Sequence, residues 1–264
     1  MTANKLSDAD LIEQIRSFTA SPTVREAPVP GSYAHLFAGE ALEAVLGHCD
    51  FRRVLDVGSG AGDHADAFQS HGKHVTSIDF GVSVYHKQKD EHRDVIIGDY
   101  YSYEFAEPFD LVWASHVREH QPNPNLFLKK LHKDLKEGGW AAISVPPLKH
   151  EIVGGHVTLW NAGLLLYQMI FAGFDCRHAA VKSYGYNISV IVQKRSIEKL
   201  PELHYDSGDI DRLSPYFPEG LKEGFNGNIR QLQWPPRQRS LPAGGFPSAY
   251  TDLISANITE RGQL

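Results

Sequence analysis

The sequence predicts an α/β protein built on a doubly wound, mostly parallel sheet of seven strands, the last of them antiparallel. Two observations predict this fold. Between residues 53 and 145, short apolar runs alternate with longer helical patterns, which is typical of a parallel sheet covered by helices on both faces. Over residues 176–193, two further strand-like runs follow each other without a helix between them, which favours an antiparallel edge.

The elements follow in order from hydrophobic periodicity. The expected parallel strands are Val54–Val57, His74–Ile78, Val95–Ile97, Leu111–Ala114 and Ala141–Val145. The expected helices are Asp63–His71, Val82–Lys87, Asn123–Leu135 and Asn161–Ala172. The last two strands are expected near Cys176–Val181 and Ile188–Gln193.

Both ends of the chain differ from this alternating region, so we divide it into three parts. Residues 1–49 form an expected N-terminal helical cap, with helices over Ser7–Phe18 and around Leu36–Leu46. Residues 50–195 form the main domain. Residues 196–264 are rich in proline and glycine and poor in apolar residues, which favours an irregular extension packed on that domain.

Composition excludes several classes of partner. The 264 residues include 26 Lys and Arg against 32 Asp and Glu, and the net charge of -6 argues against a nucleic acid partner. Two cysteines, Cys49 and Cys176, are too few for a disulfide framework, which favours a reduced, cytoplasmic protein. The near-apolar stretch Ala162–Phe174 is shorter than the roughly 20 residues of a membrane span, so we expect no membrane partner.

The most informative segment joins a buried strand to a helix start through three glycines. From Val54 to His64 it reads VLDVGSGAGDH. Glycines let a ligand approach the backbone, and a helix N-terminus offers N–H groups. The dinucleotide spacing G-x-G-x-x-G is absent, and the carboxylate of Asp63 would lie badly beside a pyrophosphate. The loop therefore favours a nucleotide-like ligand without phosphates and disfavours a dinucleotide oxidoreductase.

Acidic residues follow the next two strands. Asp79 closes the second strand, where a carboxylate can accept hydrogen bonds from both hydroxyls of a ribose. Asp99 follows the third strand, where the edge of a base would lie. The rings of Phe80 and Tyr100 would contact the faces or edges of an adenine.

In this order the motifs resemble those of the class I S-adenosylmethionine-dependent methyltransferases of the small-molecule type, which have a Rossmann-like fold. The resemblance covers roughly residues 50–195 and extends through Phe109–Val112 and Leu135–Gly139. It implies S-adenosylmethionine as the cofactor and S-adenosylhomocysteine as the product. The cofactor-binding residues that it implies are Gly58, Gly60 and Gly62 at the methionine part, Asp56 at the amino group, Asp79 at the ribose and Asp99 at the adenine.

The segment His116–His120 spells H-x-x-E-H, which on a helix is an inverted zinc-protease motif. Here it directly follows an apolar strand, and Pro122 and Pro124 cut short any helix. In the methyltransferases that the chain resembles, this segment passes under the methyl donor, so Ser115 and His116 are expected at the cofactor. Methyltransferases of the metal-dependent catechol type carry acidic ligands at these two positions, so we expect no required metal.

Methyl transfer to a hydroxyl needs a base, and histidine has a suitable pKa. Ligands of open α/β sheets bind at the carboxyl ends of the strands. His116, His120 and the loop 146–156 after the fifth strand meet this condition. Glycines at positions 154 and 155 would let the loop close and carry His156 toward the methyl group. We therefore favour His156 as the catalytic base, with His120 second.

Other residues near these strand ends would contact the acceptor. Arg118, Lys149 and His150 would offer positive charge to an anionic acceptor. Tyr184, together with Tyr186 and Asn187, either lines the acceptor side or belongs to a plain hairpin turn.

The leading functional hypothesis is O-methylation of a small molecule, a saccharide or a secondary metabolite by resemblance. Nitrogen acceptors stay open, and a homodimer is compatible with the sequence. An aminopropyltransferase of the same fold would need an acidic pair where Ser115 and His116 stand. A catalytically silent scaffold that binds S-adenosylmethionine would be expected to have a broken glycine loop or to lack Asp79, and neither is seen.

Overall fold

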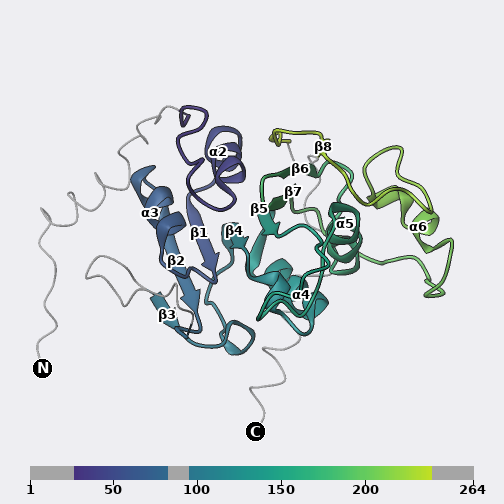
Figure 1. Ribbon diagram of the computed structural model, residues 1–264, viewed down its shortest axis with the longest axis horizontal. Coiled ribbons are helices and arrows are strands. Elements are labelled where there is room, and N and C mark those ends of the chain that lie inside the picture. The colour runs from purple at the N-terminus through teal and green to yellow at the C-terminus, as the bar shows by residue number, and fades with distance from the viewer. Residues whose placement is uncertain (1–26, 83–94, 240–264) are drawn as a thin grey trace, which may run out of the picture.

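The structure is a computed structural model, and it describes residues 27–82 and 95–239. Its centre is one sheet with the strand order β3-β2-β1-β4-β5-β7-β6-β8 (Figure 1). Strands β3, β2, β1, β4 and β5 pair in parallel, whereas β7 is antiparallel to both β5 and β6. The predicted fold class, a doubly wound and mostly parallel sheet with an antiparallel last strand of the domain, is confirmed.

The elements agree closely with the apolar runs of the sequence. The strands are β1 Arg53–Val57, β2 His74–Asp79, β3 Val95–Ile97, β4 Phe109–Ser115, β5 Leu135–Val145, β6 Ala180–Tyr184, β7 Asn187–Gln193 and β8 Gln231–Leu232. The α-helices are α2 Gly39–His48, α3 Asp63–Ser70, α4 Pro124–Asp134, α5 Ala162–Phe171 and α6 Asp209–Arg212. Short 3-10 helices are η1 Tyr100–Ser102, η2 Arg118–His120 and η3 Ser214–Tyr216. The helix expected over residues 7–18 and most of the one over 82–87 lie outside the described residues.

Strand β6 runs over Ala180–Tyr184, beginning four residues later than the expected Cys176–Val181. Two further strand features differ from the prediction. Strand β5 begins at Leu135, not at Ala141, because Leu135 already pairs with Phe109 before the register shifts. The shift is made over the intervening residues, where Gly138 has a φ of 79° that favours glycine. The second difference is β8, an added edge strand that pairs Leu232 with Val181 of β6, so that the sheet has eight strands.

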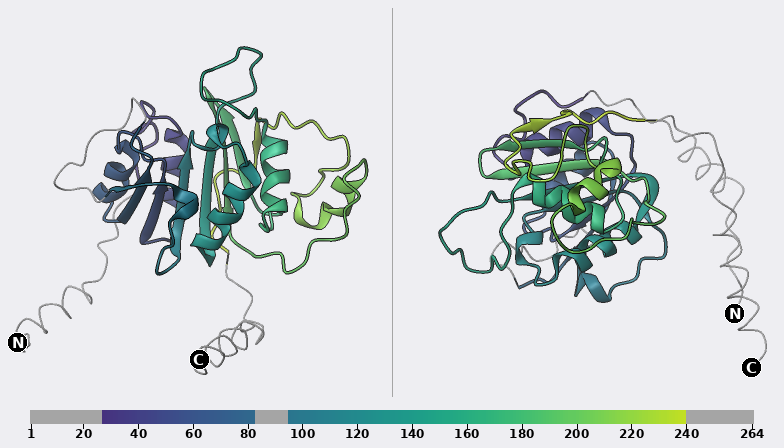
Figure 2. Two further views of the ribbon diagram at one scale, coloured as in Figure 1. Left: turned by 90° about the horizontal axis from the view of Figure 1, so that it is seen from below. Right: turned by 90° about the vertical axis from the view of Figure 1, so that its right-hand side faces the viewer.

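Helices cover both faces of the sheet, and each face has its own hydrophobic core (Figure 2). Helices α4 and α5 pack on one face with residues such as Phe127 and Leu165, which are 1% and 0% exposed. Helix α2 packs on the opposite face, where Leu42 contributes to a core that also contains Trp113 and Trp140. Burial of such side chains contributes about 1.5–3 kcal/mol each. These two layers hold the parallel strands rigidly and fix the position of their carboxyl ends.

The described part of the C-terminal extension packs on the main domain. Phe217 is 1% exposed, and its ring lies 6.1 Å from that of Tyr167 in α5 and 5.8 Å from that of Phe225. Backbone contacts between Gly163 and Gly227 join the start of α5 to the extension. Within the two described stretches, none of the helices combines the length and the apolarity needed to cross a bilayer.

Candidate active site

The carboxyl ends of β1, β2 and β4 lie side by side at the place where the strand order reverses. Val57, in the central strand β1, pairs with Ile78 of β2 on one side and with Ala114 of β4 on the other. The residues that follow these three, Gly58, Asp79 and Ser115, therefore leave the sheet as neighbours. In open α/β sheets this reversal opens a crevice in which ligands bind.

The glycine loop needs its glycines for two separate reasons. Gly58, Gly60 and Gly62 have φ values of 71°, 52° and 82°, a region that other residues rarely adopt. In addition, a Cβ on Gly58 would stand 2.3 Å from Cγ2 of Val117, so the loop after β4 packs directly on the glycine loop. Helix α3 starts immediately after Gly62. The three glycines thus let backbone, and not side chains, line this part of the crevice.

Asp79 fixes the glycine loop to the end of β2. Its carboxylate accepts a 2.9 Å hydrogen bond from the backbone N–H of Gly60 and a 2.7 Å bond from that of Gly81. A carboxylate has about four lone-pair positions, so the two backbone bonds leave acceptor capacity for ribose hydroxyls. The same side chain can therefore shape the loop and bind a ligand.

Asp56 is a buried carboxylate whose charge is not balanced within the described residues. It is 1% exposed, and its Oδ2 has no hydrogen-bond partner. Burial, reinforced by the nearby carboxylate of Asp79, raises the pKa of Asp56 to about 7. A ligand with an ammonium group would stabilise the charged form of this side chain, as the amino group predicted here would do.

Buried polar side chains without partners gather around this crevice. Within the described residues, those with orphaned side-chain atoms are Asp56, Ser59, Trp113, Ser115, Arg118 and Glu119. All six belong to β1, to β4 or to the loops that directly follow them. Buried polar groups in folded proteins are normally hydrogen-bonded. Trp113 lies in the hydrophobic core and Arg118 under Trp160, whereas Asp56, Ser59 and Ser115 are at or next to the strand ends. These three side chains fit a polar ligand such as S-adenosylmethionine.

The three residues predicted to contact the adenine differ in their positions in the structure. Phe80 is 56% exposed at the end of β2. Asp99 caps η1, because its Oδ1 accepts from the Tyr101 N–H and its Oδ2 from the Ser102 hydroxyl. The prediction that Tyr100 contacts the adenine is corrected: the residue is 6% exposed, and its hydroxyl donates a 2.8 Å bond to Asp134, the last residue of α4. Tyr100 belongs to the core because it is the first residue of η1, which turns its ring inward.

Three predicted site residues, His116 and His120 after β4 and His156 after β5, lie together around a glutamate that was not predicted as a site residue. Glu119 is fully buried, with His116 Nδ1 at 3.3 Å and His120 Nε2 at 3.9 Å from its Oε1. The imidazole rings of His120 and His156 are 5.0 Å apart, edge to face. Burial is the main cause that lowers the pKa of His156. The sequence contained Glu119 in its H-x-x-E-H motif, but burial of that carboxylate could not be predicted from the motif.

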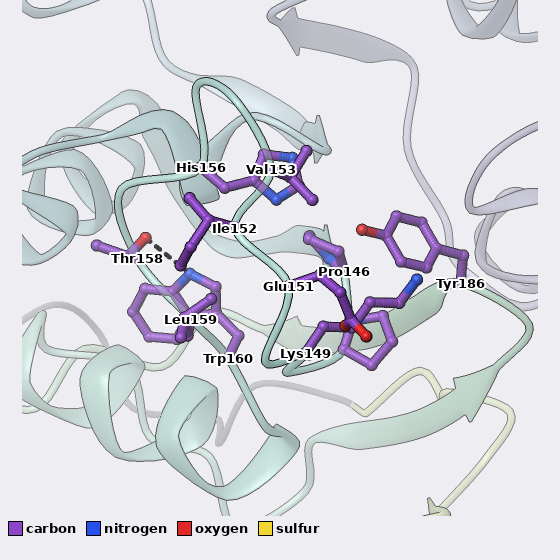
Figure 3. A pocket seen from close by; sticks show the side chains of 11 residues that line it. Pro146, Lys149, Glu151, Ile152, Val153, His156, Thr158, Leu159, Trp160 and Tyr186 are labelled. Carbon is purple, nitrogen blue, oxygen red and sulfur yellow. Dashed lines mark hydrogen bonds between the residues drawn. The ribbon is translucent and has the colours of Figure 1, made fainter.

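A pocket adjoins this cluster under the loop between β5 and α5 (Figure 3). The loop projects from the body of the protein (Figure 2). The pocket is lined by Pro146, Pro147, Lys149, Glu151, Ile152, Val153, His156, Thr158, Leu159, Trp160 and Tyr186. Lys149 Nζ lies 4.4 Å from the centre of the Tyr186 ring, which also stacks on His116 at 6.0 Å. Lys149 and His156 thus line the pocket, whereas His150 is exposed and is not a lining residue.

Two predictions about the acceptor side are corrected. Arg118 is 0% exposed, and its guanidinium lies 3.6 Å from the centre of the Trp160 ring, so it is covered and not offered to an acceptor. Burial lowers the pKa of Arg118 to about 9. The hydroxyl of Tyr184 accepts from the Ala41 N–H and bonds to Ser189, joining α2 to β7 in place of lining the pocket. Tyr186, in the turn between β6 and β7, lines the pocket instead.

The fold and the crevice together define a class of protein, an α/β enzyme that binds a cofactor at the switch point of its sheet. A family described as "Methyltransferase domain" matches residues 31–178. Because this match covers more than half of the 264 residues, the chain belongs to that methyltransferase family. The predicted class, a class I S-adenosylmethionine-dependent methyltransferase, is confirmed.

Individual relatives are similar over smaller parts. The ubiquinone biosynthesis O-methyltransferase of Pseudomonas syringae pv. tomato is 33% identical over 97 residues, 33% of this chain and 41% of that protein. The protein of the same name from Bordetella avium is 32% identical over 114 residues, 40% of this chain and 47% of that protein. The similarity thus spans less than half the length of these relatives. The crystal structure of a SAM dependent methyltransferase from Archaeoglobus fulgidus has the same fold, with a TM-score of 0.52, 17% identity and coverage of 71% of this chain and 100% of that one.

Proposed function

We propose that the chain transfers the methyl group of S-adenosylmethionine to an oxygen atom of a small molecule bound under the β5–α5 loop. The observation that carries this proposal is the group of orphaned buried polar side chains at the ends of β1 and β4. A cofactor that lies across these strand ends would supply partners for Asp56, Ser59 and Ser115. The name O-methyltransferase, carried by the curated relatives, supports oxygen as the acceptor atom.

The cofactor would lie along the strand ends with its methionine part at the glycine loop. Asp56 would bind its ammonium group, and Asp79 the ribose hydroxyls, while Phe80 and Asp99 would border the adenine. Ser115 and His116 would then lie below the sulfonium, which supplies an activated methyl group. The protein has to align acceptor and methyl carbon, so that the C–O bond forms as the C–S bond breaks.

A histidine would remove the proton of the acceptor hydroxyl. His156 is the first candidate because it lines the pocket and its lowered pKa leaves the imidazole neutral near pH 7. His120 is the second, because its ring lies against that of His156. His120 follows Ser115 and His116 along the chain, so both histidines would lie next to the methyl donor.

The lining of the pocket favours a hydroxylated aromatic acceptor of the secondary-metabolite type over a saccharide. Trp160, Tyr186, Ile152 and Leu159 present aromatic and aliphatic surface. Such surface suits a planar apolar ring, whereas a sugar would need many more hydrogen-bonding groups. The single cation at the pocket, among the described lining residues, is Lys149, which would favour an acceptor hydroxyl that ionises readily.

The test is a transfer assay with S-adenosylmethionine labelled in its methyl group. We expect the purified chain to label phenolic and catecholic hydroxyls in preference to sugars or amines, and to bind S-adenosylhomocysteine in a calorimeter. Labelling of amines alone would identify an N-methyltransferase. Cofactor binding without transfer to any acceptor would favour a scaffold that is catalytically silent. The cytoplasmic location, the homodimer and the lack of a nucleic acid partner stay predictions.

A further inference from the structure

Glu119 is a carboxylate in an unusual environment. It is 0% exposed, and no hydrogen bond within the described residues reaches either of its oxygens. Two imidazole nitrogens flank its Oε1, His116 Nδ1 at 3.3 Å and His120 Nε2 at 3.9 Å, and the charge of the neighbouring Arg118 also acts on this carboxylate. A carboxylate removed from water needs a positive charge beside it, because the desolvation cost of the bare ion is high.

Hydrogen bonds at the far side of each ring show which nitrogen faces the glutamate. His120 Nδ1 lies 2.8 Å from the carbonyl oxygen of Gly155, so Nδ1 carries a proton and the lone pair of Nε2 is left for the side of Glu119. His116 Nε2 lies 2.9 Å from Asn187 Oδ1, which also accepts from the Ala38 N–H. A backbone carbonyl or amide oxygen that orients the outer nitrogen of an imidazole is the usual arrangement of metal-binding histidines.

A third side chain, that of His156, reaches this glutamate from a distant part of the chain. His156 lies on the β5–α5 loop, and one ligand atom from each of Glu119, His120 and His156 falls within 4.8 Å of the others. The loop is held to the glutamate backbone, whose carbonyl oxygen accepts from the Val157 and Thr158 N–H groups. The sequence led us to expect no metal because acidic ligands are missing directly after β4. The fold supplies two imidazoles and one carboxylate instead.

We propose that Glu119, His120 and His156 bind one divalent transition-metal ion, for which zinc is the natural probe. Two imidazoles and a carboxylate are the donor set that first-row transition metals share, and three protein ligands leave a position open. Ligand atoms bonded at about 2.1 Å lie about 3.4 Å apart around a tetrahedral ion, so separations of up to 4.8 Å have to shorten by up to about 1.4 Å. Gly154, with no atom near its Cβ position, and Gly155, with a φ of 83°, allow the loop to make that movement.

The ion would lie beside the pocket, because His156 is both a member of the cluster and a lining residue. This consequence rests on the proposed function: an acceptor hydroxyl that occupies the open position would lose its proton to solvent more readily. Its oxygen would then attack the methyl carbon while the C–S bond breaks. His156 and His120 would act as ligands in that reaction, and the free imidazoles would act as bases only without the ion.

The experiment measures ion binding independently of methyl transfer. The full chain, treated with EDTA and exchanged into metal-free buffer, is titrated with zinc in a calorimeter, and cobalt is added as a spectroscopic probe. We expect one ion per chain and visible cobalt bands of a four- or five-coordinate site. Glu119→Gln, His120→Gln and His156→Gln should each weaken zinc binding at least tenfold. His74→Gln, at the exposed start of β2 on the opposite edge of the sheet, should leave it unchanged.

Three outcomes would overturn the proposal: no zinc binding by the chain, equal affinity in the cluster variants and in His74→Gln, or cobalt spectra of a six-coordinate aqua ion. S-adenosylhomocysteine is titrated into the same samples. Normal cofactor binding without zinc binding would refute the metal site and leave the methyltransferase proposal intact. Zinc binding by the cluster without transfer to any acceptor would support the metal site while the proposed function fails.

Discussion

A side chain on Gly58 would collide with Val117, whose Cγ2 lies 2.3 Å from the position that a Cβ would take. The glycine loop after β1 and the loop after β4 are therefore in direct contact across the switch point of the sheet. This contact brings the part of the crevice proposed for the cofactor, at Asp56 and Asp79, next to the segment that carries Glu119 and the histidines.

Substitution of Gly58 by alanine should destabilise the fold and widen the crevice. A φ of 71° and the collision with Val117 both oppose a Cβ, with an expected loss of about 2–4 kcal/mol in the free energy of unfolding. Denaturant unfolding measures it. Gly98→Ala is the matched control, because no atom lies within 4 Å of its Cβ position and its stability should barely change. Equal stability of both variants would contradict the packing described here.

Cofactor binding should depend on pH through Asp56. Its pKa of about 7 means that the carboxyl is protonated below neutrality, whereas an ammonium group prefers the ionised form. The affinity for S-adenosylhomocysteine should therefore rise with pH, by about tenfold per pH unit below 7, and level off above it. Calorimetry at pH 6, 7 and 8 measures this. Asp56→Asn should bind S-adenosylhomocysteine more weakly at pH 8, and its affinity should change little with pH. If the affinity of this variant depends on pH as strongly as that of the unchanged chain, a group other than Asp56 causes the effect.

His132 should weaken the fold in acid. Burial, together with the charge of Lys194, lowers the pKa of His132 from 6.5 to about 4. The unfolded chain therefore takes up a proton that the folded chain excludes. The contribution of neutral His132 to the free energy of unfolding is fully present above pH 6.5 and is lost as the pH falls toward 4. With partial exposure allowed for, the loss reaches about 2 kcal/mol. Thermal unfolding of the chain and of His132→Gln between pH 4 and 7 tests this, because the variant should lose less stability over that range.

Tyr100 should matter for stability and not for the cofactor. Its hydroxyl bonds to Asp134, which Lys130 also holds at 2.8 Å, so Tyr100→Phe leaves the carboxylate paired. We expect a loss of about 1 kcal/mol in stability and unchanged affinity for S-adenosylhomocysteine. Phe80→Ala, on the exposed side of β2, should show the reverse pattern. A large fall in the cofactor affinity of Tyr100→Phe would contradict this and indicate that Tyr100 contacts the adenine.

The sequence by itself determined most of the sheet and the order of the residues that we propose for the cofactor. Strands such as β3 and helices such as α4 follow from local periodicity and capping, because Asn123 and Pro124 start α4 whatever lies around it. The glycine loop, Asp56 and Asp79 are close together in sequence or at the ends of neighbouring strands. Their proximity therefore needs only the rule that parallel strands end at one edge of the sheet.

The tertiary structure alone decided which side chains are buried and which distant loops meet. The sequence could not show that Arg118 is covered by Trp160, that Tyr100 turns into the core, or that Tyr186 and not Tyr184 lines the pocket. Each depends on packing between segments far apart in the chain. The same holds for Glu119 and His156, which lie 4.8 Å or less from each other only because the β5–α5 loop folds back over the end of β4.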